Sequence, residues 1–240
     1  INSKKIIYND VNFFVKEILE SFRKNDTYDY LMYANRIIKK FGLEKSNSDS
    51  YLKARNYYNS LSRKKQDPRL LFTIILYGYQ QQMRFNGNHE FNNPVGMRWF
   101  NDKVLEKVIS FSRVLKEKNI IFKSTEYADV LKKIPKNSVV YMDPPYMLTT
   151  GSYNDGKRGF SGWTKELEKQ FLLTAEKLNK NKNRFMISYV LQHEGKINRA
   201  VKQWIKKNNY NLINLKRNTG YISNRKEVLI TNIQKDFYIS

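Results

Sequence analysis

Apolar residues along the chain follow the spacing of strands in some stretches and of helices in others. Short apolar runs rich in β-branched and aromatic residues predict strands at 5–8, 120–122, 138–142 and 184–189. Apolar positions at helical spacing predict helices over 14–22, 166–178 and 197–207. Two further runs predict a closing antiparallel strand pair at 212–215 and 227–233. Strands that alternate with helices indicate an α/β fold.

The segment 27–118 has a different pattern, because its apolar residues recur almost entirely at helical spacing. We expect helices over 28–41, 51–61 and 103–116, and a buried helix over the apolar stretch 69–79. Apolar stripes of this kind usually form a core, so we interpret them as helical packing.

The run 138–142 is expected to be a buried strand, and it ends at Asp143-Pro144-Pro145-Tyr146. Proline cannot donate to a sheet ladder, and it forces the residue before it into an extended conformation. Asp143 is therefore expected at the carboxyl end of a strand, where ligands bind in open α/β sheets. A carboxylate, backbone carbonyls and an aromatic face could grip a flat nitrogenous ring. The alternative is a proline turn whose tyrosine simply packs nearby.

A polar and aromatic stretch, 78–98, follows the buried helix. Asn86-Gly87-Asn88 is a turn signal, so we expect a β-hairpin that projects from the helices. The stretch carries the arginine, asparagine, glutamine and aromatic side chains that proteins use to read DNA grooves. Solvated hairpin side chains are the alternative interpretation.

Charge and residue counts restrict the function classes. The 240 residues contain 44 Lys and Arg against 22 Asp and Glu, a net charge of +22 that favours a polyanionic partner. An AT-rich genome, which inflates lysine, is an alternative source of part of this charge. Cysteine is absent and histidine occurs twice, which excludes disulfides and argues against a metal site. No run of 18 apolar residues occurs, so we expect a cytoplasmic nucleic-acid protein without a membrane span.

The tetrapeptide 143–146 resembles the catalytic motif of D12-class (alpha group, Dam-type) DNA adenine-N6 methyltransferases, in their phage and restriction-modification branch. This resemblance implies a Rossmann-like methyltransferase sheet in 1–26 and 119–240, with an inserted, mainly helical target-recognition domain, 27–118, carrying the hairpin 79–100. It implies transfer of a methyl group from S-adenosylmethionine, which becomes S-adenosylhomocysteine, to an adenine flipped out of duplex DNA. The implied catalytic residues are Asp143, Pro144, Pro145 and Tyr146.

The same resemblance assigns roles outside the tetrapeptide. Cofactor contacts fall on Asp10 (ribose), Tyr127 (adenine ring) and Asp143; helix capping by Asp10, and capping or core packing around Tyr127, are the alternatives. In the hairpin, Tyr79 would wedge into the base stack, Pro94 would pack on a base edge, and Arg98 would contact guanine. The remaining DNA contacts would be Arg84, Asn86, Arg217, Asn218, Arg225 and Lys226, the last four in a basic loop that meets phosphates or is simply solvated.

The sequence departs from the family pattern in two places. Gln80-Gln81 stands where the family has Asn followed by Gly or Asn, which affects the grip on the partner base. The ten glycines of the sequence include no Gly-x-Gly. The family's first strand is followed by a glycine loop that wraps the cofactor, so we expect that strand and its loop upstream of Ile1. The alternatives are an inactive methyltransferase-derived DNA-binding protein and an RNA methyltransferase.

Several further expectations rest on the resemblance. They are a GATC-like site, a monomer, a cognate restriction endonuclease as partner, and a location on the bacterial nucleoid or in a phage-infected cell. The polar segment 147–161 is expected to be a loop that orders over substrate.

Overall fold

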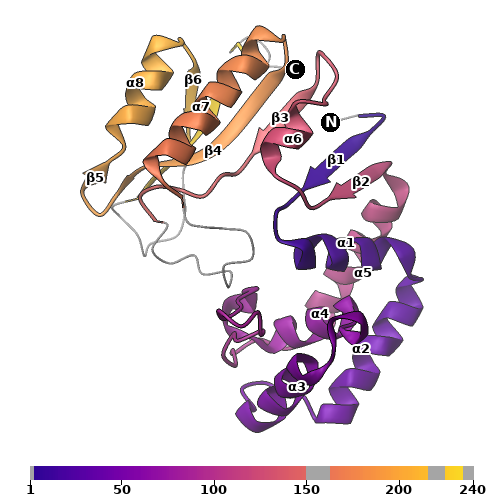
Figure 1. The fold of residues 1–240 in the computed structure, drawn as a ribbon. Coiled ribbons are helices and arrows are strands. Elements are labelled where there is room, and N and C mark those ends of the chain that lie inside the picture. The colour runs from indigo at the N-terminus through magenta and orange to yellow at the C-terminus, as the bar shows by residue number, and fades with distance from the viewer. Residues whose placement is uncertain (1–2, 150–162, 216–224, 235–240) are drawn as a thin grey trace. The chain divides into compact units, whose positions relative to one another are not determined.

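The computed structural model describes residues 3–149, 163–215 and 225–234 (Figure 1). Contacts divide them into two compact units, which we call the first unit (described residues up to 127) and the second unit (described residues from 128). The mixed α/β architecture expected from the sequence is confirmed. Among the described residues, no helix has both the length and the apolar character needed to cross a membrane.

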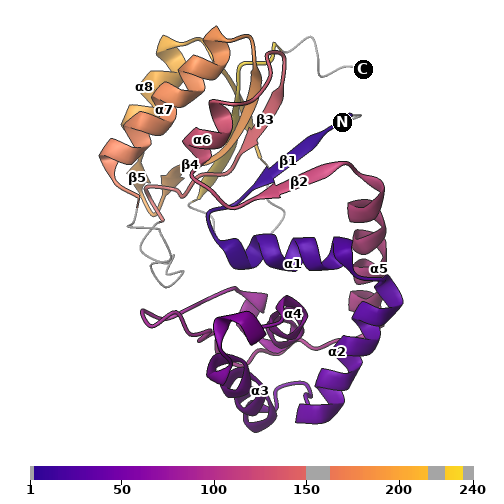
Figure 2. The same cartoon turned by 45° about the vertical axis from the view of Figure 1, so that its right-hand side comes forward.

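Helices surround a central apolar helix in the first unit. Every residue of the central helix α4 (Pro68–Tyr77) from Leu70 to Tyr77 except Phe72 is buried, as the apolar sequence predicts. Asp67 caps α4, and Pro68 occupies its first turn, where the missing N–H costs nothing. The helices that contact it are α1 (Phe13–Lys24), α2 (Thr27–Phe41) and α3 (Ser48–Ser60), and α5 (Asp102–Glu117) packs on α1 and α2. Figure 2 shows α4 among these helices.

Two parallel strands complete the first unit. The strand β1 (Ile6–Asn9) pairs with β2 (Ile120–Lys123) in the register Ile6↔Ile120 to Asn9↔Lys123. Parallel pairing places both carboxyl ends at the same edge, so the loops after Asn9 and Lys123 lie close together.

The second unit is built on a mixed sheet. Its strand order is β3-β4-β7-β6, with β3 parallel to β4 and the remaining neighbours antiparallel. The closing antiparallel strand pair predicted near the C-terminus is therefore confirmed. The strands are β3 (Val139–Met142), β4 (Arg184–His193), the short β5 (Lys196–Ile197), β6 (Asn211–Asn214) and β7 (Lys226–Thr231). The helices α7 (Lys165–Lys180) and α8 (Arg199–Lys207) lie side by side against β4, and the short α6 (Tyr127–Leu131) precedes β3 (Figures 1 and 2).

The expectation that 138–142 is a buried strand is wrong. Val139 is 43% exposed and Tyr141 is 61% exposed, although Met142 at the end of β3 is buried. The reason is that β3, among the described residues, pairs with β4 alone and forms the edge of the sheet. Apolar sequence therefore predicts the strand correctly but not its position in the sheet.

The segment 78–100 is held by isolated bridges, Gly78↔Val95 and Phe85↔Phe91, rather than by a continuous ladder. Both phenylalanines of the second bridge are fully buried in the core of the first unit, and Phe85 stacks on Phe14 at 4.5 Å between ring centroids. The first bridge brings two backbones together, because a Cβ built on Gly96 would lie 2.5 Å from the Gly78 carbonyl oxygen.

This close approach predicts that Gly96→Ala destabilises the protein. The added methyl would meet backbone that cannot rotate away, so we expect a loss of about 1–3 kcal/mol in the free energy of unfolding, measured by urea denaturation. Gly87→Ala is the matched control, since a Cβ at Gly87 has nothing within 4 Å. Equal unfolding midpoints for the two variants would contradict the packing described here.

Candidate active site

The tetrapeptide 143–146 begins directly after the last residue of β3. Met142 pairs with Ile187 of β4, so Asp143 leaves the sheet at the carboxyl end of β3, beside the middle of the longer strand β4. The Asp143 side chain is exposed, whereas Pro144 is buried. The turn thus presents its carboxylate outward while its proline ring fixes the backbone beneath it.

The Tyr146 side chain folds back onto this carboxylate. Its hydroxyl donates to Asp143 Oδ1 at 2.6 Å and lies 3.3 Å from the Ser188 hydroxyl on β4. Burial, followed by the hydrogen bond to Asp143, raises the pKa of Tyr146 to about 12. The tyrosine is therefore neutral at physiological pH and occupies one acceptor atom of Asp143.

Two further side chains border the Tyr146 ring. Tyr189 meets it edge to face at 5.6 Å between centroids, and the Arg225 guanidinium lies 5.8 Å from its centroid. Arg225 is held by Glu227 at 2.8 Å. The resemblance assigns Arg225 to phosphate contacts; the structure places it beside the turn 143–146, while Lys226 is exposed at the start of β7.

A separate set of polar side chains lies at the carboxyl ends of β1 and β2. Asn9 accepts the Thr125 N–H at 3.1 Å and donates to the Thr125 carbonyl at 2.9 Å, which ties the two strand ends together. Asp10 follows, and its carboxylate accepts the Asn12 N–H at 2.8 Å and the Tyr8 hydroxyl at 3.3 Å. The alternative in which Asp10 caps the first helix is wrong, because Asn12 is the N-cap of α1.

One alternative to a cofactor contact at Tyr127 is that the residues around it cap a helix. Ser124 Oγ donates to the Val11 carbonyl and Thr125 Oγ1 donates to Asn9, so both hydroxyls bond to the β1 side rather than to α6. Tyr127 is the first residue of α6 and is half-buried. Its contact with a cofactor ring stays a prediction.

The predicted DNA-reading residues of the hairpin lie on an exposed surface. Tyr79 is 50% exposed, and Arg84, Pro94 and Arg98 are exposed as well. Asn86 is engaged within its own turn, accepting the N–H groups of Asn88 and Glu90 and donating to the Glu90 carboxylate at 2.6 Å. Asn86 therefore shapes the turn as well as lying on its surface.

Backbone strain occurs beside Tyr79. Gln80 and Gln81 have φ values of 48° and 55°, a left-handed conformation that side chains other than glycine seldom adopt. The buried Asn93 supports this bend, because its Nδ2 donates to the Tyr79 carbonyl at 3.0 Å. Gln81 Oε1 in turn accepts from Arg98 Nη1 at 3.2 Å. Gln80-Gln81, the pair that departs from the family pattern, thus forms a strained bend, and Gln81 of this pair contacts Arg98.

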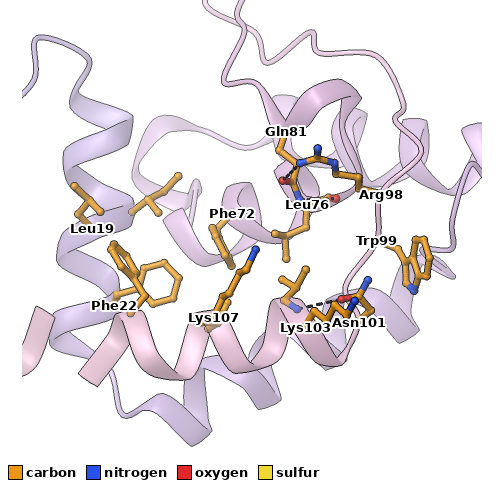
Figure 3. Close-up of a pocket in the computed structure, with 14 residues that line it drawn as sticks. Leu19, Phe22, Phe72, Leu76, Gln81, Arg98, Trp99, Asn101, Lys103 and Lys107 are labelled. Atoms are coloured by element: carbon orange, nitrogen blue, oxygen red, sulfur yellow. Dashed lines mark hydrogen bonds between the residues drawn. The ribbon is translucent and has the colours of Figure 1, made fainter. Parts of the chain in front are cut away.

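A hollow of about 640 Å³ opens next to this pair, between α1, α4 and α5. Figure 3 shows Arg98 and Gln81 on one side, Lys103 and Lys107 on the other, and apolar side chains between them. The cations add positive charge beside the predicted reading residue Arg98.

The structure also brings in residues that the sequence did not single out. Ser188 and Tyr189 contact Tyr146. The sequence predicts a strand over these two residues, but the apolar pattern of a strand does not indicate which side chains it will contact. Arg217 and Asn218 lie outside the described residues, as does most of the segment 147–161 that was expected to order over substrate.

Comparison with known proteins matches residues 1–221 to the family described as D12 class N6 adenine-specific DNA methyltransferase. The chain is 38% identical to the Type II methyltransferase M.FokI of Planomicrobium okeanokoites, over 97% of this chain and 36% of that protein. It is 33% identical to the modification methylase StsI of Streptococcus sanguinis, over 98% of this chain and 37% of that protein. With the DNA adenine methylase of Escherichia coli (strain K12) it shares 29% identity, over 55% of this chain and 45% of that protein. The chain thus spans little more than a third of the first two relatives.

The raised pKa predicts how Tyr146 titrates. Because the folded protein favours the neutral phenol, this preference adds stability below pH 10 and is lost as the pH rises through about 12. The difference in phenolate absorbance between the wild type and Tyr146→Phe should therefore be nearly zero at pH 10. A half-ionised tyrosine in that difference spectrum at pH 10 would contradict the burial and the bond to Asp143.

Proposed function

This chain belongs to the D12 class of N6 adenine-specific DNA methyltransferases, and on that basis we propose that it is the part of such an enzyme that transfers a methyl group to adenine N6 in duplex DNA. The observation that carries the proposal is the Asp143–Tyr146 turn at the carboxyl end of β3, with its exposed carboxylate and its aromatic ring held beside it.

The chemistry of the adenine amino group explains why such a turn is suitable. Its nitrogen is a poor nucleophile because the lone pair is delocalised into the ring. The Asp143 carboxylate and the Pro144 carbonyl can each accept one N–H, which favours a pyramidal nitrogen with a directed lone pair. Tyr146 can stack on the ring and hold its plane, as aromatic groups do for extruded bases. The turn then acts mainly by positioning.

The Tyr146 hydroxyl must leave Asp143 before the amino group can bind there. In the structure it occupies Asp143 Oδ1 at 2.6 Å, with Ser188 as a second partner at 3.3 Å. Exchange of one hydrogen-bond donor for another leaves the carboxylate satisfied throughout. Asp143 is thus kept oriented before a base arrives.

S-adenosylmethionine, the methyl donor expected for this family, supplies an electrophilic sulfonium methyl group when bound. The half-buried carboxylate of Asp10 suits the hydroxyls of its ribose, since a carboxylate accepts more hydrogen bonds than the two it receives here. Tyr127 offers an aromatic side chain at the start of α6 for the adenine ring. Asp143 is the third proposed cofactor contact.

We assign the reading of duplex DNA to the segment 27–118, with 1–26 and 119–240 as the catalytic domain. The exposed surface of 79–100 and the net charge of +22 support this division of roles. In this proposal Tyr79 wedges into the stack, Pro94 packs on a base edge, Arg98 contacts guanine in a GATC-like site, and Arg84 and Asn86 face DNA. Arg217, Asn218, Arg225 and Lys226 would approach phosphates.

The alternative of an inactive DNA-binding derivative finds no support, because the relatives are named as methyltransferases or methylases and the tetrapeptide is complete. We also propose a monomer that works beside a cognate restriction endonuclease in a bacterial or phage-infected cell; of these points, the name of the relative StsI as a modification methylase supports the role in restriction and modification.

Replacing Asp143 tests the proposed chemistry. The full-length protein carrying Asp143→Ala should lose methyl transfer to unmethylated duplex DNA by at least about 100-fold, because the amino group loses its charged acceptor. Its affinity for the same duplex should change little, since the assigned DNA contacts are elsewhere. Retained turnover in this variant would remove Asp143 from the reaction, and absent turnover in the wild type would overturn the proposed function.

Replacing Arg98 tests the proposed readout. A bidentate arginine–guanine contact contributes about 1–3 kcal/mol of discrimination, so Arg98→Ala should relax the choice of site by about 5- to 150-fold. Lys107→Ala is the charge-matched control from the rim of the same hollow, and it should change affinity for all duplexes alike. Sequencing of the methylated DNA would map the site preference of each of the two variants. An unchanged site preference in Arg98→Ala would exclude Arg98 from sequence readout.

A further inference from the structure

Three polar side chains on one face of α3 bond to the backbone of the segment 78–100, within the first unit. Tyr51, Arg55 and Asn59, which we call the α3 clamp, are four residues apart and therefore lie on the same side of the helix. The Tyr51 hydroxyl donates to the Asn93 carbonyl at 2.8 Å, and Arg55 Nη1 donates to the same oxygen at 3.1 Å. The proposed DNA contacts include none of these three residues.

Asn59 bonds to Phe91 as a residue of a neighbouring strand would. Its Nδ2 donates to the Phe91 carbonyl at 2.9 Å, and its Oδ1 accepts the Phe91 N–H at 2.9 Å. The next residue, Asn92, directs its N–H the other way and donates to the Arg84 carbonyl at 3.0 Å. Because the segment forms isolated bridges instead of a ladder, side chains of α3 supply the partners that a third strand would give to the backbone of 91–93.

Asn93 connects the α3 clamp to the residue proposed to wedge into the base stack. Asn93 is 0% exposed, and while its carbonyl is held by Tyr51 and Arg55, its Nδ2 donates to the Tyr79 carbonyl at 3.0 Å. The Tyr79 N–H donates to the carbonyl of Pro94 at 2.8 Å. Two consecutive residues thus hold the backbone of Tyr79, and α3 fixes the first of them.

We propose that the α3 clamp consists of positioning residues for recognition of the DNA site. It fixes the arm 91–93 and thereby sets where Tyr79, bonded to Asn93, and Arg84, bonded to Asn92, meet the duplex. This inference rests on the proposed function, since it assumes that the segment 78–100 reads DNA. It assigns to α3 a part in site choice that needs no contact between α3 and a base.

Energetics favour a positioning role over a purely stabilising one. The fully buried rings of Phe85 and Phe91 already attach the segment to the core, but burial of apolar surface has no preferred direction. Hydrogen bonds are directional, so those of the α3 clamp fix the register of the arm. Arg55 Nε and Asn93 Oδ1 are buried without a hydrogen-bond partner among the described residues, a cost that apolar side chains would avoid.

The test compares two asparagines of α3 in the full-length protein. Asn59→Ala removes both bonds to Phe91. Asn56→Ala is the matched control, because Asn56 is an exposed residue of the same helix. Tyr51→Phe is the second variant if Asn59→Ala fails to fold, since it removes one hydroxyl and leaves Arg55 on the Asn93 carbonyl.

Site choice is measured by binding, so that the result does not depend on methyl transfer. Each protein selects duplexes from a random pool, and sequencing of the retained duplexes gives the enrichment of the preferred site. The Kd for an unrelated duplex and the amide exchange of Phe91 are measured with the same proteins.

We expect the enrichment to fall at least about fivefold in Asn59→Ala and at least about twofold in Tyr51→Phe, because displaced readers lose part of their discrimination. The Kd for the unrelated duplex should stay within about threefold of wild type, since phosphate contacts carry that affinity. The Phe91 amide should exchange faster in Asn59→Ala, and Asn56→Ala should match wild type in every readout.

Equal enrichment in Asn59→Ala and Asn56→Ala would overturn the inference, as would wild-type enrichment in Tyr51→Phe if Asn59→Ala does not fold. A wild type that transfers methyl groups but selects no site would overturn this inference alone. A wild type that selects a site but transfers no methyl group would overturn the proposed function, and the enrichment ratios would still decide the role of the α3 clamp.

Discussion

Two consecutive prolines at the end of β3 set the conditions for the candidate active site. They restrict Asp143 to an extended conformation and remove two N–H donors, so the sheet cannot continue past Met142. The chain must then turn, and Tyr146 returns to bond the carboxylate at 2.6 Å. Every role proposed for the turn depends on this fixed direction of the backbone.

Contacts from β4 complete what the prolines begin. Ser188 and Tyr189 reach the hydroxyl and ring of Tyr146, and the network behind Tyr189 ends in the oriented carboxylate of Glu168. In the first unit a comparable device supports Tyr79, where the buried Asn93 and the Gly78–Gly96 contact hold a strained bend. In both units buried polar groups fix exposed residues in place. Preorganisation of this kind suits a reaction that depends on positioning.

Much of the fold could be predicted from the sequence, because the periods of apolar residues report directly on strands and helices. The turn after β3 was predictable from its prolines, and the antiparallel pair β6–β7 from two short apolar runs. The exposure of β3 could not be predicted, since the identities of Val139 and Tyr141 do not indicate which strand lies beside them. The partners of Tyr146 were equally hidden, because contacts between Ser188, Tyr189 and Glu168 arise only when distant segments pack.

The identity of the methylated base tests the central claim most directly. Unmethylated duplex DNA is incubated with the full-length protein and S-adenosylmethionine carrying a deuterated methyl group, and the nucleosides are then analysed by mass spectrometry. A carboxylate and a carbonyl that together hold the adenine amino group predict that the label appears as N6-methyladenine. Label in N4-methylcytosine, or duplex binding without any labelled nucleoside, would contradict the account.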